Sequence, residues 1–299
     1  MLNKAVAPAT LQVYKRAWAL CRECMAFLNL QCITINDLPL DFRTILLFVS
    51  YLHLKGLAPS SIVTYISAIG YVHKIFAVPD PTSQFVVQKI LGAITKLHSK
   101  ADSRLPITQF ILHRLLESVD KVVNDDYLIR LIKAMFLLAF YGLFRVGEIT
   151  IQTSGVVSLK VEQLHVFNDR FVLNITNFKN NKTNKPFDIV VHCQQSNYCP
   201  YVGMLRYLQV RKFDSGPLFR FKDGAPVTRS FFTSKLKDCI SFCGLDPKVF
   251  KSHSFRMGGA SFLASIGKSD LQIQLLGRWS SNSFLRYIRN QKFNVFSKS

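Results

Sequence analysis

A short polar segment, KLHSKADSRLP at residues 96–106, divides the sequence into two parts. It interrupts a chain in which 49% of the residues are hydrophobic, and it ends at Pro106, which cannot continue a helix. The chain has 299 residues, enough for two domains with separate cores. We therefore predict one domain over residues 1–100, a linker at about 100–106 and a second domain over 107–299.

The first domain is predicted to be a bundle of short helices. Over residues 9–29 apolar side chains recur at steps of three and four, the period of an amphipathic helix: Leu11, Tyr14, Trp18, Cys21 and Met25. Further helices are expected at about 40–54, just beyond Pro59 and at about 83–99. Cys21, Cys24 and Cys32 begin like a metal knuckle, but no second close pair of ligands follows, so no metal site is predicted.

The second domain is predicted to combine helices with a small antiparallel sheet. A long apolar helix is expected over 124–144, and helices are expected at about 199–212 and 229–243. Between residues 156 and 193 the period changes to that of short strands, in the segments VVSLK, QLHVF, FVLNITN and DIVVHC. The Asn-rich turn FKNNKTNKP before the last segment indicates a hairpin. The predicted fold class is mainly α with this small sheet.

The end of the chain gathers cations around one tyrosine. From Lys248 onward there are nine Lys and Arg residues against a single acid, Asp270, and Tyr287 is the only tyrosine after Tyr207. His253 and Arg256 are three residues apart, which places them on one face of a helix. Tyrosine forms covalent intermediates when its neighbours activate it, so a lone tyrosine in a cationic segment points to a nucleophile aimed at a phosphate.

Four motifs, in this order along the chain, resemble the tyrosine recombinase (phage-integrase) family. They are Gly142-Leu143-Phe144-Arg145-Val146-Gly147-Glu148, then His253-x-x-Arg256, then Gly277-Arg278-Trp279, then Tyr287. The segments HSFRMGGAS and LGRWSSNSFLRYIR look most like the recombinases of eukaryotic mobile elements, the DIRS-type and Crypton groups. The phrase GLAPSSIVTYISAI resembles the SAM-like core-binding domain of the family, which implies a DNA-binding role for the first domain.

The resemblance implies a role for each matching residue. Tyr287 would be the nucleophile, Arg145 and Arg256 would clamp the phosphate, and His253 and Trp279 would add hydrogen bonds to it. The family places a catalytic lysine on a hairpin, where Lys179 fits best and Lys182 is the rival; a solvated turn is the plain alternative for these lysines. Glu148 is expected to hold local structure, and a pair between Arg145 and Glu148 at i+3 is the plain alternative to the clamp.

Other residues of the same stretch are given roles by charge and apolar pattern. Arg278, Arg286 and Arg289 are expected to contact the DNA backbone, on charge alone. Gly258 and Gly259 leave room for close approach of a backbone or of DNA. Gly277 is expected to end a helix before Trp279. Residues 261–266 and 271–276 are expected to be buried helical faces.

The activity implied by the resemblance is that of a site-specific DNA recombinase or integrase. Such an enzyme cleaves and rejoins strands through a 3′-phosphotyrosine link, needs no metal or other cofactor, and here would serve DNA integration of a mobile element. Double-stranded DNA would be the partner of a homo-tetramer on paired sites. Two alternatives stay open at this point: a domesticated DNA-binding protein without catalysis, and a type IB topoisomerase-like enzyme that relaxes DNA.

Charge and composition favour a nucleic-acid partner. The formal net charge is +20 and the pI is about 9.8, which favours nucleic acid first and an acidic membrane surface second. No apolar run approaches the roughly 20 residues of a membrane span, and the first residues lack a secretory pattern. The seven cysteines form no repeated framework, which favours an intracellular setting, the nucleus if the host is eukaryotic.

Overall fold

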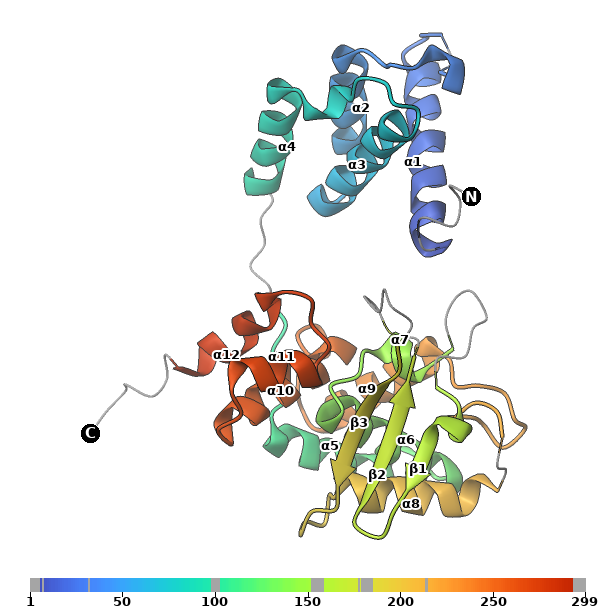
Figure 1. The fold of residues 1–299 in the computed structure, drawn as a ribbon, viewed down its shortest axis with the longest axis vertical. Coiled ribbons are helices and arrows are strands. Elements are labelled where there is room, and N and C mark those ends of the chain that lie inside the picture. The colour runs from blue at the N-terminus through green and yellow to red at the C-terminus, as the bar shows by residue number, and fades with distance from the viewer. Residues whose placement is uncertain are drawn as a thin grey trace. The chain divides into compact units, whose positions relative to one another are not determined.

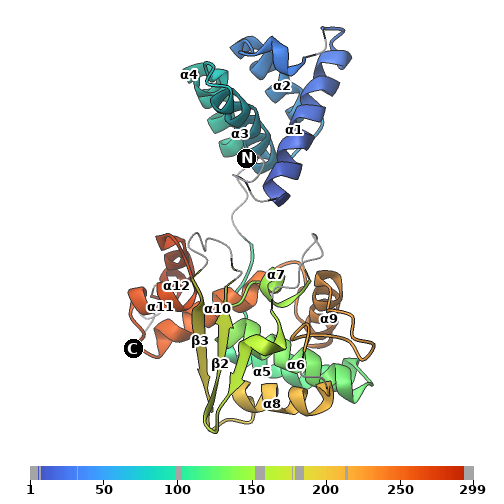
Figure 2. The same cartoon turned by 45° about the vertical axis from the view of Figure 1, so that its right-hand side comes forward.

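The computed structural model describes residues 6, 8–31, 33–97, 103–151, 159–176, 178, 185–212 and 215–292, without the side chains of Pro8 and of residues 289–292. The chain divides into two compact units, Met1–Asp102 and Ser103–Ser299 (Figures 1 and 2). Each unit has its own hydrophobic core. The two hairpin lysines singled out from the sequence, Lys179 and Lys182, lie outside the described residues.

The regular elements of unit 1 are all helical within its described residues. Its helices are α1 (Pro8–Phe27), α2 (Phe42–Leu54), α3 (Pro59–Ile75) and α4 (Phe85–Leu97). Local sequence explains two of the starts: the carboxylate of Asp41 accepts the amide N–H of Arg43 before α2, and Pro59 occupies the first turn of α3. Cys21 and Cys24 lie in the core, where burial raises the pKa of their thiols to about 12 and about 11.

Unit 2 packs helices around one long buried helix, α6 (Asp126–Tyr141). The others are α5 (Gln109–Val122), α7 (Val146–Ile149), α8 (Pro200–Arg211), α9 (Arg229–Phe242), α10 (Ser252–Ser265), α11 (Asp270–Leu276) and α12 (Leu285–Lys292). The helix α5 was not predicted from the sequence. Ten of the sixteen residues of α6 are buried, so this helix forms the centre of the larger core.

A three-stranded antiparallel sheet completes unit 2, in the order β1-β2-β3 (Figures 1 and 2). Its strands are β1 (Leu164–Val166), β2 (Arg170–Ile175) and β3 (Phe187–His192). Alternate residues of β2 are buried, namely Phe171, Leu173 and Ile175, so one face of the sheet joins the core. This arrangement confirms the predicted fold class, mainly α with a small antiparallel sheet. In the segment VVSLK, which was also predicted as a strand, residues 156–158 lie outside the described part of the chain.

Two glycines bring α10 against the end of α6. A Cβ atom on Gly258 would overlap the carbonyl oxygen of Ile107, and one on Gly259 would overlap that of Phe140. The close approach at these glycines is therefore that of protein backbone, the first of the two expected possibilities. It places the first turns of α10, which carry His253 and Arg256, next to the turn that follows α6.

The apolar residues of α11 are mostly exposed, contrary to prediction. Leu271 is 64% exposed and Leu275 is 57% exposed, whereas Ile273 is fully buried. With only seven residues, α11 presents a single side chain to the small core that Ile273 shares with Ala260, Phe284 and Ile288. Ile266, at the end of α10, is also exposed, so neither predicted face is buried along its whole length.

Candidate active site

The turn that follows α6 sets the position of Arg145. Leu143 adopts a left-handed backbone conformation, with φ of 51°, although it has a side chain. Leu143 and Phe144 are buried, which fixes the turn against the core, and the short helix α7 begins just after Arg145. Strained backbone of this kind is held only where the surroundings over-determine it. Its effect here is to present the carbonyl oxygen of Leu143 to two guanidinium groups.

Glu148 holds Arg145 in place. Its carboxylate accepts the backbone N–H of Arg145 at 2.9 Å, and its other oxygen accepts Nη1 of the Arg145 side chain, also at 2.9 Å. The ion pair between Arg145 and Glu148, which the sequence offered as the alternative to a phosphate clamp, is therefore present. This ion pair does not use all the N–H groups of the Arg145 guanidinium, and the Arg145 side chain remains 26% exposed. Arg145 thus keeps donors toward solvent while its orientation is fixed.

Arg278 lies inside the protein, where the sequence led us to expect a DNA contact at the surface. Its side chain is 1% exposed and pairs with Glu148 at 3.1 Å. It also donates to the carbonyl oxygens of Gly142 and Leu143, each at 3.3 Å. Its guanidinium carbon lies 4.7 Å from the centre of the Phe144 ring. The observed position makes Arg278 a brace between the turn after α6 and the end of α11, not a surface cation.

Charge balance in this buried region depends on Glu148. Burial by itself would raise the pKa of its carboxyl group, but Arg278 and Arg145 outweigh burial and lower that pKa below its ordinary value. Glu148 is therefore ionised at neutral pH. Its burial agrees with the structural role expected from the sequence.

Arg256 lies deepest of these side chains. It is fully buried, and its two terminal nitrogens donate to the carbonyl oxygens of Leu143 and Gly277. Its Nε has no partner among the described residues. Burial, together with the neighbouring charges of Arg145 and Arg278, lowers the pKa of Arg256 to about 9. An anion beside this guanidinium would use its remaining N–H groups and relieve the repulsion between the arginines.

Trp279 covers Arg256, and Gly277 makes room for it. The guanidinium carbon of Arg256 lies 4.0 Å from the centre of the Trp279 ring, a cation–π arrangement. A Cβ atom on Gly277 would overlap this ring. Gly277 is the C-cap residue directly after α11, as expected, but the left-handed conformation belongs to the next residue, Arg278, with φ of 55°. The glycine is therefore needed for ring packing and not for its own backbone angle.

Tyr287 reaches the same place from α12. Its hydroxyl oxygen lies 2.8 Å from Nε2 of His253 on α10. The backbone carbonyl of Tyr287 accepts the hydroxyl of Ser261 at 3.1 Å, which ties α12 to α10. The rings of Tyr287 and Trp279 have their centres 6.4 Å apart. Residues from the middle and the end of the sequence are thus assembled around one tyrosine hydroxyl.

Taken together, the site holds Arg145, Arg256 and Arg278 against one carboxylate, that of Glu148; we call these four residues the arginine cluster. The cluster has two more positive charges than negative ones, next to a tyrosine–histidine pair.

Arg286 is exposed on α12, and the side chain of Arg289 lies outside the described part of the chain. The sequence offered one signal for the role of Arg278: it lies directly between Gly277 and Trp279, both fixed by packing.

Within the described ranges, no three His, Cys, Asp or Glu side chains are grouped so that they could hold a metal ion. None of the described helices is long and apolar enough to span a membrane.

Solved structures share this architecture over nearly the whole chain. A lambda integrase dimer bound to a COC′ core site matches with a TM-score of 0.63, at 15% identity, over 96% of this chain and 73% of that one. The XerH site-specific recombinase bound to palindromic difH substrate matches with a TM-score of 0.60, at 16% identity, over 88% of this chain and 72% of that one. The chain has the tyrosine recombinase fold.

A curated sequence relative points the same way. The integrase/recombinase xerD homolog of Selenomonas ruminantium is 24% identical over 315 residues, which cover 99% of this chain and 85% of the relative. The Tn1549 transposon integrase in complex with transposon right-end DNA also matches, with a TM-score of 0.57 at 15% identity over 97% of this chain and 99% of that one. No family model matches the chain. The relative and the solved structures together support the tyrosine recombinase/integrase family.

Proposed function

We propose that this chain is a site-specific DNA recombinase that cleaves and rejoins strands through a covalent bond between Tyr287 and a 3′-phosphate. The observation that carries the proposal is the 2.8 Å contact between the Tyr287 hydroxyl and His253, next to a buried arginine with N–H groups to spare. The DNA-bound structures that share the fold support DNA as the partner. The order of the four motifs along the chain supports the same role for each residue.

The chemistry starts at the tyrosine hydroxyl. As the Tyr287 oxygen attacks phosphorus, its proton passes to Nε2 of His253, which is within hydrogen-bond distance when that nitrogen is unprotonated. The bond from phosphorus to the 5′-oxygen breaks, and that oxygen must take up a proton. Lys179, with Lys182 as its rival, is proposed as the donor. The freed 5′-hydroxyl of a partner strand then attacks the phosphotyrosine bond and restores the backbone.

The arginine cluster is proposed to stabilise the reacting phosphate. A phosphodiester carries one negative charge, and the five-coordinate state reached during attack carries two on its nonbridging oxygens. The excess of two positive charges in the cluster matches the second state better than the first, so stabilisation increases as the reaction proceeds. Arg145 and Arg256 would contact the oxygens, whereas Arg278 donates to the carbonyl oxygen of Leu143, to which Arg256 also donates.

Finer features of the function are proposed on sequence alone. The sequence around His253 and Trp279 favours a recombinase of a eukaryotic mobile element of the DIRS or Crypton type. Integration of that element would be the biological outcome, and the protein would act in the nucleus. Unit 1 is proposed as the core-binding domain and unit 2 as the catalytic domain. A homo-tetramer on paired sites is proposed as the working assembly.

The proposal is tested with duplex substrates in which cleavage releases a short fragment and traps the covalent product. Wild-type protein, incubated in EDTA with such DNA from its element's ends, should give a labelled adduct on a denaturing gel. Tyr287→Phe should give none, while Tyr198→Phe, which removes a tyrosine hydroxyl elsewhere in unit 2, should behave as wild type. Tight DNA binding without any adduct would instead favour a domesticated DNA-binding protein.

A further inference from the structure

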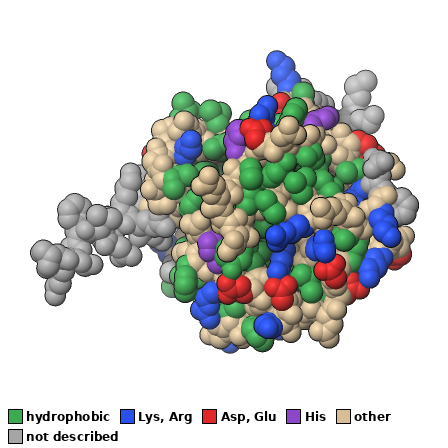
Figure 3. Space-filling model, turned by 90° about the horizontal axis from the view of Figure 1, so that it is seen from below, with side chains coloured by type: hydrophobic (Ala, Val, Ile, Leu, Met, Phe, Trp, Pro, Cys, Tyr) green, Lys and Arg blue, Asp and Glu red, His purple; other side chains and the backbone are tan. Residues whose placement is uncertain are grey.

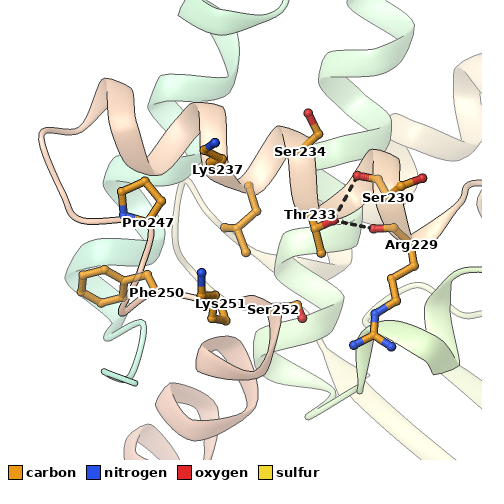
Figure 4. A pocket seen from close by; sticks show the side chains of 10 residues that line it. Arg229, Ser230, Thr233, Ser234, Lys237, Pro247, Phe250, Lys251 and Ser252 are labelled. Carbon is orange, nitrogen blue, oxygen red and sulfur yellow. Dashed lines mark hydrogen bonds between the residues drawn. The ribbon is translucent and has the colours of Figure 1, made fainter. Parts of the chain in front are cut away.

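A second cationic site lies in a cavity between α9 and the start of α10, which we call the α9–α10 cavity (Figure 4). Its volume is about 580 Å³. Arg229, Lys237 and Lys251 line it together with four Ser and Thr side chains, and no carboxylate is among the described residues of its lining. Leu236 and Phe250 supply a buried apolar floor. Such a lining is suited to an anion that also accepts hydrogen bonds.

No acidic side chain among the described residues neutralises the cations of the α9–α10 cavity. Within the described ranges, none of Arg229, Lys237 and Lys251 has an acid within ion-pair distance, and all three are exposed. Lys235, two residues before Lys237, instead pairs with Asp238 at 3.1 Å. Elsewhere in unit 2 pairing is common, and the face seen in Figure 3 has acidic side chains beside its Lys and Arg side chains. The cavity therefore holds charge that is available to a ligand.

The α9–α10 cavity adjoins the candidate active site along the chain. Lys251 and Ser252 belong to its lining, and the next residue is His253, which contacts Tyr287. Figure 4 shows Lys251 pointing from the start of α10 toward α9, the helix that carries Lys237. The first turn of α10 thus contributes residues to both the cavity and the candidate active site. The N-terminus of α10, the positive end of the helix dipole, lies between them.

We propose that the α9–α10 cavity binds a phosphodiester of the DNA backbone other than the one that Tyr287 attacks. This inference rests on the proposed function and adds a contact to it. Ammonium, guanidinium and hydroxyl groups are the side-chain partners that proteins use for DNA phosphates. Because these cations are exposed and have no ion pair among the residues that the structure describes, they release counterions from DNA without first breaking such a pair. The cavity therefore contributes affinity and register, with no role in the chemical step.

The test is equilibrium binding of the full-length chain to duplex DNA over a series of salt concentrations. The chain carries Tyr287→Phe, so that binding is measured without cleavage. Lys237→Gln and Lys251→Gln are each expected to reduce the slope of log K against log salt by about 0.9, which corresponds to about eight-fold weaker binding at 0.1 M salt. Lys235→Gln, on the same helix but paired with Asp238, is the matched control and should keep the parent slope.

The outcomes separate this inference from the proposal on which it rests. If Lys237→Gln and Lys251→Gln both keep the parent slope, the cavity is not a phosphate site, even where the wild-type chain forms an adduct. If their slopes fall while the wild-type chain forms no adduct, the cavity stands as a DNA contact and the strand-cleavage proposal fails. A wild-type chain that binds no duplex DNA would overturn both.

Discussion

The arginine cluster and the α9–α10 cavity place the same kinds of charge in opposite environments. In the cluster, Arg256 and Arg278 are buried, and backbone carbonyl oxygens and one carboxylate fix their positions. In the cavity, Lys237 and Lys251 are exposed and have no ion pair within the described ranges. Buried, oriented charge acts strongly on a reacting group because no water has to reorganise around it. Exposed charge provides affinity that salt weakens.

The largest effect expected from this difference is on stability, at Glu148. Glu148→Gln leaves Arg278 buried without its charge partner, so the free energy of unfolding should fall by about 3–5 kcal/mol. Denaturant unfolding of the full chain measures this change. Glu148→Gln combined with Arg278→Met should be more stable than Glu148→Gln alone, since it removes the unpaired charge. A loss below about 1 kcal/mol in the single variant would mean that the cluster does not depend on Glu148.

The second effect is on the rate of strand cleavage, at Arg256. Arg256→Lys keeps a positive charge but loses the planar group that donates to two carbonyl oxygens and still has N–H groups for phosphate. Adduct formation with saturating DNA should slow by about 10²–10³-fold, the usual loss for one donor to a reacting oxygen. Arg130→Gln, which removes an arginine paired with Asp126 on α6, is the control and should leave the rate unchanged.

The third effect concerns the packing that covers Arg256. Gly277→Ala should push the Trp279 ring aside and lower the free energy of unfolding by about 1–3 kcal/mol. The chain has two tryptophans, Trp18 and Trp279, so in a Trp18→Phe background the emission of Trp279 alone reports the movement. Gly92→Ala is the control, because nothing lies near that position on α4 and alanine favours a helix. Unchanged emission and stability in Gly277→Ala would refute the packing role.

The smallest effect is the pH dependence of the cluster. Because the pKa of Glu148 is lower in the folded chain than its ordinary value of 4.5, its ionisation stabilises the fold above that pH. This contribution is lost as the pH falls through the lowered pKa. The difference in unfolding free energy between wild type and Glu148→Gln should therefore narrow in acid. A difference that stays constant from neutral pH to about pH 3 would show that Glu148 is not held ionised.

Much of the fold and of the site could be predicted from the sequence. Helical periodicity and helix-breaking residues indicated unit 1, and the change to alternating segments indicated the sheet. The spacing of His253 and Arg256 predicted a shared helix face, which α10 provides. The order of motifs singled out Arg145, Trp279 and Tyr287, and the structure brings these side chains together with His253 and Arg256.

The remaining features depend on tertiary packing that no local pattern encodes. On its charge Arg278 is expected to contact the DNA backbone, yet it lies inside the protein. Its burial follows from its own left-handed backbone and from the carboxylate of Glu148, 130 residues earlier in the chain. The helix α5 is an exception, because its buried residues Leu112, Leu115, Leu116 and Val119 follow the helical period and are readable from the sequence. The leucines of α11 looked buried because a short helix gives too few turns to separate one face from another.

The central claim is that Tyr287 itself becomes bonded to DNA, and peptide mass spectrometry tests it most directly. The covalent product formed in EDTA would be trimmed with nuclease, digested with protease and searched for a peptide that carries a nucleotide 3′-phosphate. A single modified peptide is expected, with the added mass on Tyr287. A nucleotide attached to any other residue, or trapped DNA that is not covalently bound to the protein, would contradict it.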